Sequence, residues 1–185
     1  MTATNVQISG YVAGTWIIDP VHTHVGFMVK HVMVSRVRGR FGTFSGEITT
    51  AENPLDSTVS VSIEAASVDT NNATRDNHIR SADFLDAENH PTLSFASTGI
   101  RFDAGEFFID GVLTIRGVSK PVTLDVEAPE FGPSAKGGTK AGFSATLEIN
   151  RTEFGVNYNG PIPGGGVSVS EKVRIMLDVE ADLVE

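Results

Sequence analysis

Hydrophobic and polar residues alternate along most of the chain with a period of two. In residues 106–115, for example, every second position is apolar or glycine: Phe107, Ile109, Gly111, Leu113 and Ile115. Similar rows occur at 25–29, 59–65, 93–95, 122–126, 141–149 and 173–181. This alternation predicts antiparallel strands with one face buried and the other in water. With the segments around Trp16 and 41–48, the pattern predicts about eight or nine strands.

Turn-forming residues separate the predicted strands. Asn53-Pro54 precedes the row at 59–65, Asp103-Ala104-Gly105 precedes the next hairpin strand, and Arg116-Gly117 follows it. The Gly- and Pro-rich segment 157–166 predicts the longest loop. An all-β chain of this kind forms a sandwich or a closed barrel, and closure removes exposed strand edges.

Residues 70–86 break the alternation and predict a short helical excursion around 71–86. Asn71 or Asn72 is suited to cap the helix, and Asp76 and Arg80 have the spacing of an i,i+4 ion pair. Arg75, His78, Ile79 and Ala82 then share one helix face, whereas Ser81 and Asp83 begin a second turn that directs Phe84 and Leu85 the other way.

Length and charge narrow the class of protein. The 185 residues suffice for one domain with a substantial core. A net charge of −9, with only 14 Lys and Arg, disfavours nucleic acid as a partner. An anionic membrane surface is disfavoured for the same reason, unless basic residues gather in a local patch. The absence of cysteine excludes disulfides, thiolate metal sites and a cysteine nucleophile.

No targeting or membrane-spanning signal is visible in the sequence. The first residues, MTATNVQISGYVAGTW, contain no basic region and no long apolar run. No segment approaches the roughly 20 apolar residues that cross a bilayer. We therefore expect a cytoplasmic protein without a transmembrane segment.

Four sequence blocks carry a family resemblance. They are TWIIDPVHTHVGFMVKH (15–31), RGRFGTFSGEI (38–48), SVDTNNATRDNHIRSADFLDAENHPTLSF (67–95) and GVLTIRGVSKPVTL (111–124). Over most of residues 15–183 the chain resembles the YceI-like family, also described as polyisoprenoid-binding proteins. The resemblance implies an extended, eight-stranded antiparallel lipocalin-like β-barrel. We expect a single domain over 15–185 after a flexible tail over 1–14, a segment that the resemblance does not constrain. Many relatives are exported to the periplasm, a property that we do not carry over to this chain.

The resemblance also implies a function. It implies a soluble carrier or sequestering protein that is no enzyme, needs no cofactor and holds a long isoprenoid lipid in an apolar tunnel. The lipid would be a polyprenyl phosphate or a quinone-type molecule, and by analogy the protein could form a homodimer. Burial of a dozen methylene-sized groups supplies roughly 10 kcal/mol before the costs of binding, so the tail needs no ionic anchor.

The alternation, together with the helical excursion, selects the residues that would face this ligand. They are the inward apolar residues Phe27, Val29, Phe41, Phe44, Ile63, Phe95, Leu113, Ile115 and Phe143, the polar His31 on the same face as Val29, and Arg75, His78, Ile79, Phe84 and Leu85 of the helical excursion. In the alternative interpretation the apolar rows simply fill a core. Arg75, His78 and Arg80 either donate to a lipid phosphate or hold the helix on the barrel.

Metal and catalytic interpretations have weaker support. His22 and His24 lie at i and i+2 on a predicted strand, but a metal site would need a third ligand, and we predict no metal. The sequence contains no G-x-S-x-G and no H-E-x-x-H motif. One alternative function is a small-molecule-processing or stress-response protein that uses His24, His31 or His78 in the same cavity. Another is a structural or partner-binding β-domain whose interior is filled.

Overall fold

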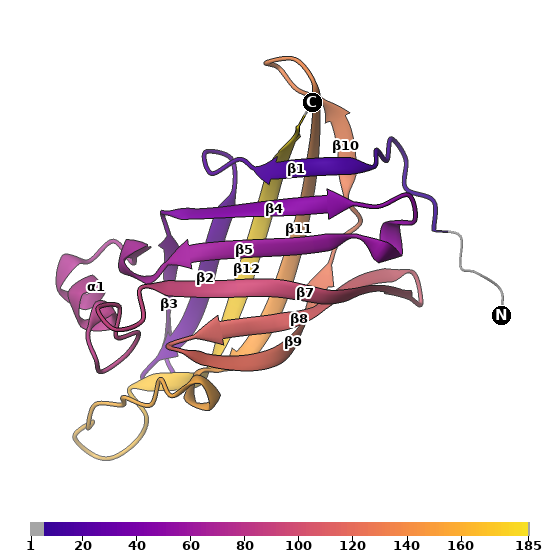
Figure 1. The fold of residues 1–185 in the computed structure, drawn as a ribbon. Coiled ribbons are helices and arrows are strands. Elements are labelled where there is room, and N and C mark those ends of the chain that lie inside the picture. Colours follow the sequence, from indigo (N-terminus) through magenta and orange to yellow (C-terminus); the bar gives the residue numbers. More distant parts are fainter. Residues whose placement is uncertain (1–5, 185) are drawn as a thin grey trace.

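Eight antiparallel strands form a closed barrel in the computed structural model, which describes residues 6–184 (Figure 1). Going round the barrel, the strands are β12 (Val169–Leu183), β1 (Gly14–Ile18), β4 (Phe44–Thr50), β5 (Thr58–Glu64), β7 (Thr92–Asp103), β8 (Glu106–Ile115), β9 (Val118–Val126) and β11 (Thr139–Asn150). Pairing of β11 with β12 along 140–150 and 172–182 closes the ring. The predicted barrel is therefore confirmed.

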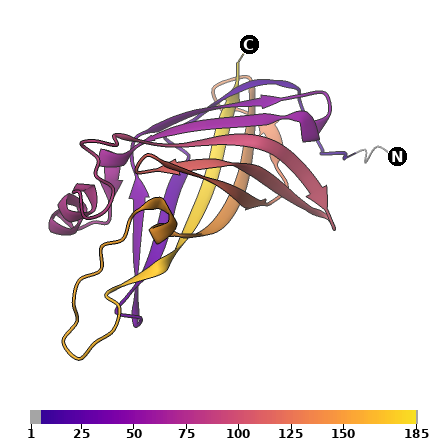
Figure 2. The ribbon, with the colours of Figure 1, turned by 60° about the horizontal axis from the view of Figure 1, so that its bottom comes forward.

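A second wall branches from the barrel at β12. Strand β1 pairs with the end of β12, whereas β2 (His24–His31) pairs with residues 169–178 of β12 along the same edge. Strand β3 (Ser35–Phe41) continues this wall, and the two-residue strand β6 (Val68–Asp69) ends it. Figure 2 shows the β2–β3 hairpin and the loop before β12 projecting beyond the ring at the same end.

The hydrophobic pattern places most strands but misses three. The predicted rows lie in strands except at Ala65, which begins a 3-10 helix after β5, and residues such as Ile109 and Leu113 are buried as expected. The sheet nevertheless has twelve strands rather than eight or nine, because β3, β6 and β10 (Glu130–Pro133) were not predicted. Strands β6 and β10 are too short to show a period. In β3, Gly39 interrupts the inward row between Val37 and Phe41.

The predicted helical excursion is present as α1 (Ala73–Arg80) followed by turns. The Asn72 side chain caps the helix by accepting from the Arg75 N–H. The predicted Asp76–Arg80 ion pair was wrong. The Asp76 carboxylate instead accepts from the backbone N–H and hydroxyl of Thr70 at 2.9 and 2.6 Å, because that loop leaves two donors buried beside it.

Short 3-10 helices and the N-terminal segment complete the molecule. The 3-10 helices are η1 (Pro54–Asp56), η2 (Ala65–Ser67) and η3 (Arg151–Phe154). Residues 1–5 of the predicted tail lie outside the described part. Later in that segment, the Tyr11 hydroxyl donates to the Ala51 carbonyl at 2.7 Å, and its ring packs edge-on against Phe131. Within 6–184 no helix has the length and hydrophobicity required to cross a membrane.

Candidate functional site

A cavity of about 440 Å³ lies between the branched wall, α1 and the loop before β12. Strands β2, β3 and β12 form one side of it, α1 with the following turn forms the second, and residues 156–169 form the third. The lining includes the exposed residues His31, His78 and Tyr158, so the cavity opens to solvent at this rim. Its volume falls in the usual range of small-molecule sites, about 300–1,000 Å³.

Most of the predicted site residues line this cavity. They are Phe27, Val29, His31, Phe41, Arg75, His78, Ile79, Phe84, Leu85 and Ile115. The structure places Phe44, Ile63, Phe95 and Leu113 in or against the barrel core instead. Alternation shows that a side chain faces inward but not at which height in the barrel it lies. These four residues occur at heights where inward side chains meet, so they fill the middle of the barrel.

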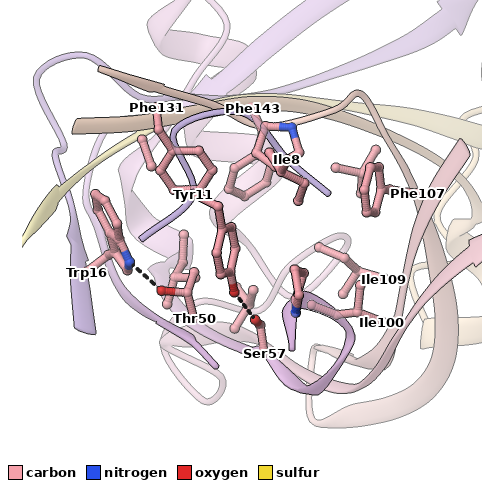
Figure 3. A pocket seen from close by; sticks show the side chains of 16 residues that line it. Ile8, Tyr11, Trp16, Thr50, Ser57, Ile100, Phe107, Ile109, Phe131 and Phe143 are labelled. Carbon is pink, nitrogen blue, oxygen red and sulfur yellow. Dashed lines mark hydrogen bonds between the residues drawn. The ribbon is translucent and has the colours of Figure 1, made fainter. Parts of the chain in front are cut away.

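A second, smaller cavity of about 80 Å³ lies at the other end of the barrel (Figure 3). Phe107 at the start of β8 lines this cavity, whereas Ile115 at the end of β8 lines the larger one. Phe143, the remaining predicted site residue, belongs to the smaller cavity. Polar groups that line the smaller cavity already bond to each other: Trp16 Nε1 donates to Thr50 Oγ1 at 2.8 Å. No residue lines both cavities, so the hollow interior is divided in two.

The charged groups of the larger cavity are all basic. Arg75 and Arg151 line it, together with His31 and His78, and no Asp or Glu among residues 6–184 does. Arg75 donates from Nε to Thr70 Oγ1 at 2.7 Å and from Nη2 to the Thr70 carbonyl at 2.8 Å. Its Nη1 makes no hydrogen bond within residues 6–184, so the guanidinium is held in place with one edge available to a ligand.

Arg151 is a site residue that sequence reasoning missed. It is 5% exposed, and it donates to the carbonyls of Val156, Tyr158, Val169 and Ser170 at 2.7–3.2 Å. Burial lowers the pKa of its guanidinium. Because carbonyls take four of its five N–H donors, Arg151 fixes the loop that forms one cavity wall. The only feature of the sequence that points to Arg151 is its position, as a basic residue, close to the apolar residues Phe154 and Val156.

Three aromatic rings meet at the rim of the cavity. The ring centroids of His78, Phe84 and Tyr158 lie 4.9–5.2 Å apart, and His78 Nε2 lies 2.7 Å from Asp83 Oδ2. This cluster joins α1 to the loop across the opening. Tyr158, Gly160 and Ser168 were also missed, because a loop has no hydrophobic period from which to predict the orientation of its side chains.

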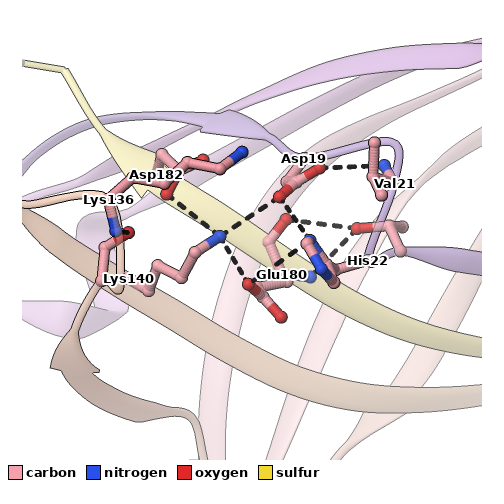
Figure 4. A network of polar contacts seen from close by, with 9 residues as sticks. Asp19, Val21, His22, Lys136, Lys140, Glu180 and Asp182 are labelled. Carbon is pink, nitrogen blue, oxygen red and sulfur yellow. Dashed lines mark hydrogen bonds and ion pairs between the residues drawn. The ribbon is translucent and has the colours of Figure 1, made fainter.

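The paired histidines near β2 belong to a different place. His22 lies 2.8 Å from Asp19, and these two with Glu180 bring their ligand atoms within 4.8 Å of one another (Figure 4). Two members of this group, Asp19 and Glu180, already form ion pairs with Lys140 Nζ, which also pairs with Asp182. The ring of His24 does not join the group but lies over Gly26, where a Cβ would be 2.4 Å from Nε2.

The Asp19 cluster has strongly shifted acid–base equilibria. Hydrogen bonding to His22, together with Lys140, holds the pKa of the Asp19 carboxyl well below its usual range despite burial. Hydrogen bonding to Glu180, Asp182 and Asp19 raises the pKa of the Lys140 ammonium. The cluster lies on the outer face of β12, where it ties the corner between β1 and β2 to β11, and it is separate from the cavity.

A closed eight-stranded barrel with an apolar cavity open at one end is the architecture of lipocalin-like ligand-binding proteins. Comparison with known proteins agrees: the YceI-like domain matches residues 16–181, and the chain belongs to this family. Protein YceI of Escherichia coli O157:H7 is 39% identical over 161 residues, which cover 86% of this chain and 81% of that protein.

Solved structures show the same fold. The Campylobacter jejuni YCEI protein is 31% identical, with a TM-score of 0.73, and the match covers 96% of this chain and all of that one. A polyisoprenoid binding domain from Saccharophagus degradans is 13% identical, with a TM-score of 0.64, over 94% of this chain and all of that domain. The second likeness shows the fold alone.

Proposed function

We propose that this protein binds the hydrocarbon chain of an isoprenoid lipid in the 440 Å³ cavity and acts as a carrier or store rather than as an enzyme. The observation that carries the proposal is an apolar cavity, open at one rim, whose charged groups are all basic. The shared fold with a polyisoprenoid binding domain supports it. An isoprenoid tail requires only apolar wall, which Phe27, Val29, Ile115 and Ile175 provide.

The basic lining favours a phosphorylated head group over a neutral one. In a chain of net charge −9, two arginines and two histidines face this cavity, and no carboxylate of the described residues does. Arg75 is positioned by Thr70 and keeps one N–H edge available, which suits a phosphate oxygen. We therefore propose a polyprenyl phosphate as the ligand, with its phosphate near Arg75 at the rim.

The lipid itself is tested by extraction. Mass spectrometry of organic extracts of the purified protein should reveal a prenyl lipid, and added prenyl phosphate should raise the melting temperature. Phe27→Asp places a carboxylate in the apolar wall and should abolish this stabilisation. Extracts without prenyl lipid, together with an unchanged melting temperature, would contradict the proposal. A turnover of a small molecule that is lost in His78→Ala would favour an enzyme instead.

The head group is tested by comparing two ligands. Arg75→Ala removes a charge-assisted hydrogen bond, so binding of a prenyl phosphate should weaken about tenfold or more, whereas binding of the matching prenyl alcohol should change little. Arg38→Ala, on the outer face of β3, is the control and should affect neither ligand. Equal binding of both ligands by wild type and Arg75→Ala would remove the role of Arg75.

A further inference from the structure

Six of the fourteen Lys and Arg residues gather on one outer face of the branched wall. We call this the basic face, and it consists of Lys30, Arg36, Arg38, Arg40, Lys172 and Arg174. Residues such as Val29, Val37 and Val173 line the cavity, so the alternate residues on the same strands point outward. The strand register sets Arg174 beside Met28 and Met28 beside Arg38, and it pairs Lys30 with Arg36.

The basic face has a net positive charge even when the acids that pair with it are included. Arg40 pairs with Asp69 at 3.3 Å and Lys172 with Glu148 at 2.9 Å. The other four cations form no ion pair with an acid in residues 6–184. With Glu171 included, six cations face three carboxylates. The sign of this face is thus opposite to that of the whole chain, so this side is attracted to an anionic surface.

Exposed apolar residues continue the basic face at its end. At the tip of the β2–β3 hairpin, Met33 is 59% exposed and Val34 is 88% exposed. The Val32 N–H donates to the Ser168 carbonyl at 2.9 Å, which ties this tip to the loop of the cavity wall. Val167 in that loop is also exposed. Figure 2 shows the hairpin and the loop projecting together. Their sequence neighbours His31 and Ser168 line the cavity, so these exposed apolar residues lie close to its rim.

Edge protection alone does not explain this arrangement. Charged side chains on an exposed edge strand such as β3 discourage pairing with other chains. Lys30, Lys172 and Arg174, however, lie on β2 and β12, which are paired on both sides. An edge-protecting device would also not place Met33 and Val34 in water. Cations beside an exposed apolar tip are the combination that binds an anionic lipid surface.

We infer that the basic face docks on an anionic lipid bilayer, with the tip residues Met33 and Val34 entering the interface. Docking in this orientation brings the rim of the cavity to the membrane, so a lipid passes between bilayer and cavity with little exposure to water. The role of docking in lipid transfer rests on the proposed function, because it requires that the cavity binds a lipid. The surface itself can be tested without any isoprenoid.

The test is co-sedimentation with vesicles that contain no isoprenoid. Wild type should bind vesicles of phosphatidylglycerol and phosphatidylcholine in equal parts, less at high salt, and bind pure phosphatidylcholine weakly. Each basic residue near an anionic leaflet raises binding about fivefold, so Arg36→Gln with Arg38→Gln should weaken it by about tenfold or more. The matched control, Arg101→Gln with Lys136→Gln, changes the same net charge elsewhere and should bind like wild type.

A second variant tests the apolar tip. Met33 has a positive φ of 56°, which Asn tolerates well, so Met33→Asn with Val34→Ser should fold normally and still bind anionic vesicles less tightly. Equal weakening by the matched control would overturn the inference. So would wild type that ignores anionic vesicles but binds a soluble polyanion such as heparin, a result that indicates an acidic macromolecule instead.

Binding of prenyl phosphate in solution separates the two proposals. Arg36 and Arg38 point away from the cavity, so their double variant should keep full prenyl phosphate binding. Prenyl phosphate binding without vesicle binding overturns docking alone. Vesicle binding without prenyl phosphate binding leaves docking supported and contradicts the proposed function.

Discussion

Gly39 keeps the cavity open beside Phe27. The two residues are register partners on β3 and β2, and a Cβ built on Gly39 would lie 2.3 Å from the Cζ atom of the Phe27 ring. The ring therefore lies over the bare backbone of Gly39 instead of extending into the cavity. A missing side chain on one strand thus sets the free space on the ligand side of the wall.

Gly39→Ala should push the Phe27 ring into the cavity. We expect binding of a prenyl lipid to weaken about tenfold and the free energy of unfolding to fall by about 1–3 kcal/mol, because the added Cβ would also lie 2.9 Å from the methyl carbon of the buried Thr70. Gly132→Ala is the control, since a Cβ there meets no atom within 4 Å. Isothermal titration and urea denaturation give both quantities, and undiminished lipid binding would show that the ring has another place to go.

At this scale the sequence selected some strand residues of the cavity and those of α1 and its turn, but not Val37, Val173 and Ile175 on the strands or the residues of the loop before β12. Phe27, Val29 and Phe41 follow from alternation, because a strand has only two faces. Arg151 and Tyr158 could not be predicted, since their positions depend on how the backbone carbonyls of residues 156–170 converge on one guanidinium. Such convergence is a property of the folded loop and leaves no period in the sequence.

Two arginines hold α1 and its following turn against the barrel. Arg80 donates to the carbonyls of Ala66 and Val68 at 2.7 and 3.0 Å. Arg116, in the β8–β9 hairpin, donates from Nη1 to the carbonyls of Ala82 and Phe84, both at 2.6 Å. Because Phe84 lines the cavity, the β8–β9 hairpin controls one of its walls.

Arg116→Asn should loosen this turn without disturbing the hairpin. Arg116 and Gly117 have φ angles of 51° and 72°, and Asn-Gly is the preferred pair for such a turn. Loss of the two hydrogen bonds should lower the free energy of unfolding by about 1–2 kcal/mol and speed ligand release. Hydrogen exchange of residues 82–87 should accelerate.

The matched control for this prediction is Ala104→Asn. It introduces Asn-Gly at the β7–β8 hairpin, where Ala104 has a φ of 50°, and it touches nothing in the 81–87 turn. It should therefore leave both exchange and ligand release unchanged. Equal exchange at residues 82–87 in Arg116→Asn and wild type would mean that other contacts hold the turn.

At the element scale, the presence of a helix was easier to predict than the contacts of its side chains. The break in alternation and the Asn72 cap predicted α1, because both are local properties of the chain. The Asp76–Arg80 pair was not formed, since each side chain found backbone partners outside the helix. Those partners come from segments whose approach to the helix depends on the tertiary fold.

For the whole molecule, the Asp19 cluster makes stability depend on pH. The carboxyl has a lowered pKa in the folded state, so it contributes stability above its unfolded pKa of about 3.9 and loses it as pH falls further. Lys140, with a raised pKa, contributes below about pH 10.4 and loses its contribution above that. The cluster should therefore stabilise the fold most between about pH 4 and pH 10.

Asp19→Asn should lower the free energy of unfolding by roughly 1–3 kcal/mol at neutral pH. The difference from wild type should shrink as pH falls below about 4, because the Asp19 carboxyl of the unfolded chain then takes up a proton while that of the folded protein stays ionised. Urea denaturation at a series of pH values measures it. Asp125→Asn, at an exposed carboxylate on β9, is the control. A difference that stays constant at low pH would show that Asp19 acts through packing alone.

The closed barrel was only partly predictable at this scale. Alternation left a sandwich and a barrel open, and the family resemblance chose between them. Neither showed that β12 would pair with both β1 and β2 along one edge, because that depends on the corner at residues 19–23. The division of the interior into two cavities depends on which inward side chains meet, and this too follows only from the folded ring.

The branch at β12 has a mechanical consequence. The β2–β3 wall is joined to the ring through β12, and the ladder at its far edge consists of two residue pairs between β3 and β6. We expect this wall to move outward about its junction with β12. The two residue pairs between β3 and β6 would then break, while every ladder of the eight-stranded ring stays intact. The protein can then admit ligands of different width at the rim of the cavity while the eight-stranded ring keeps its structure.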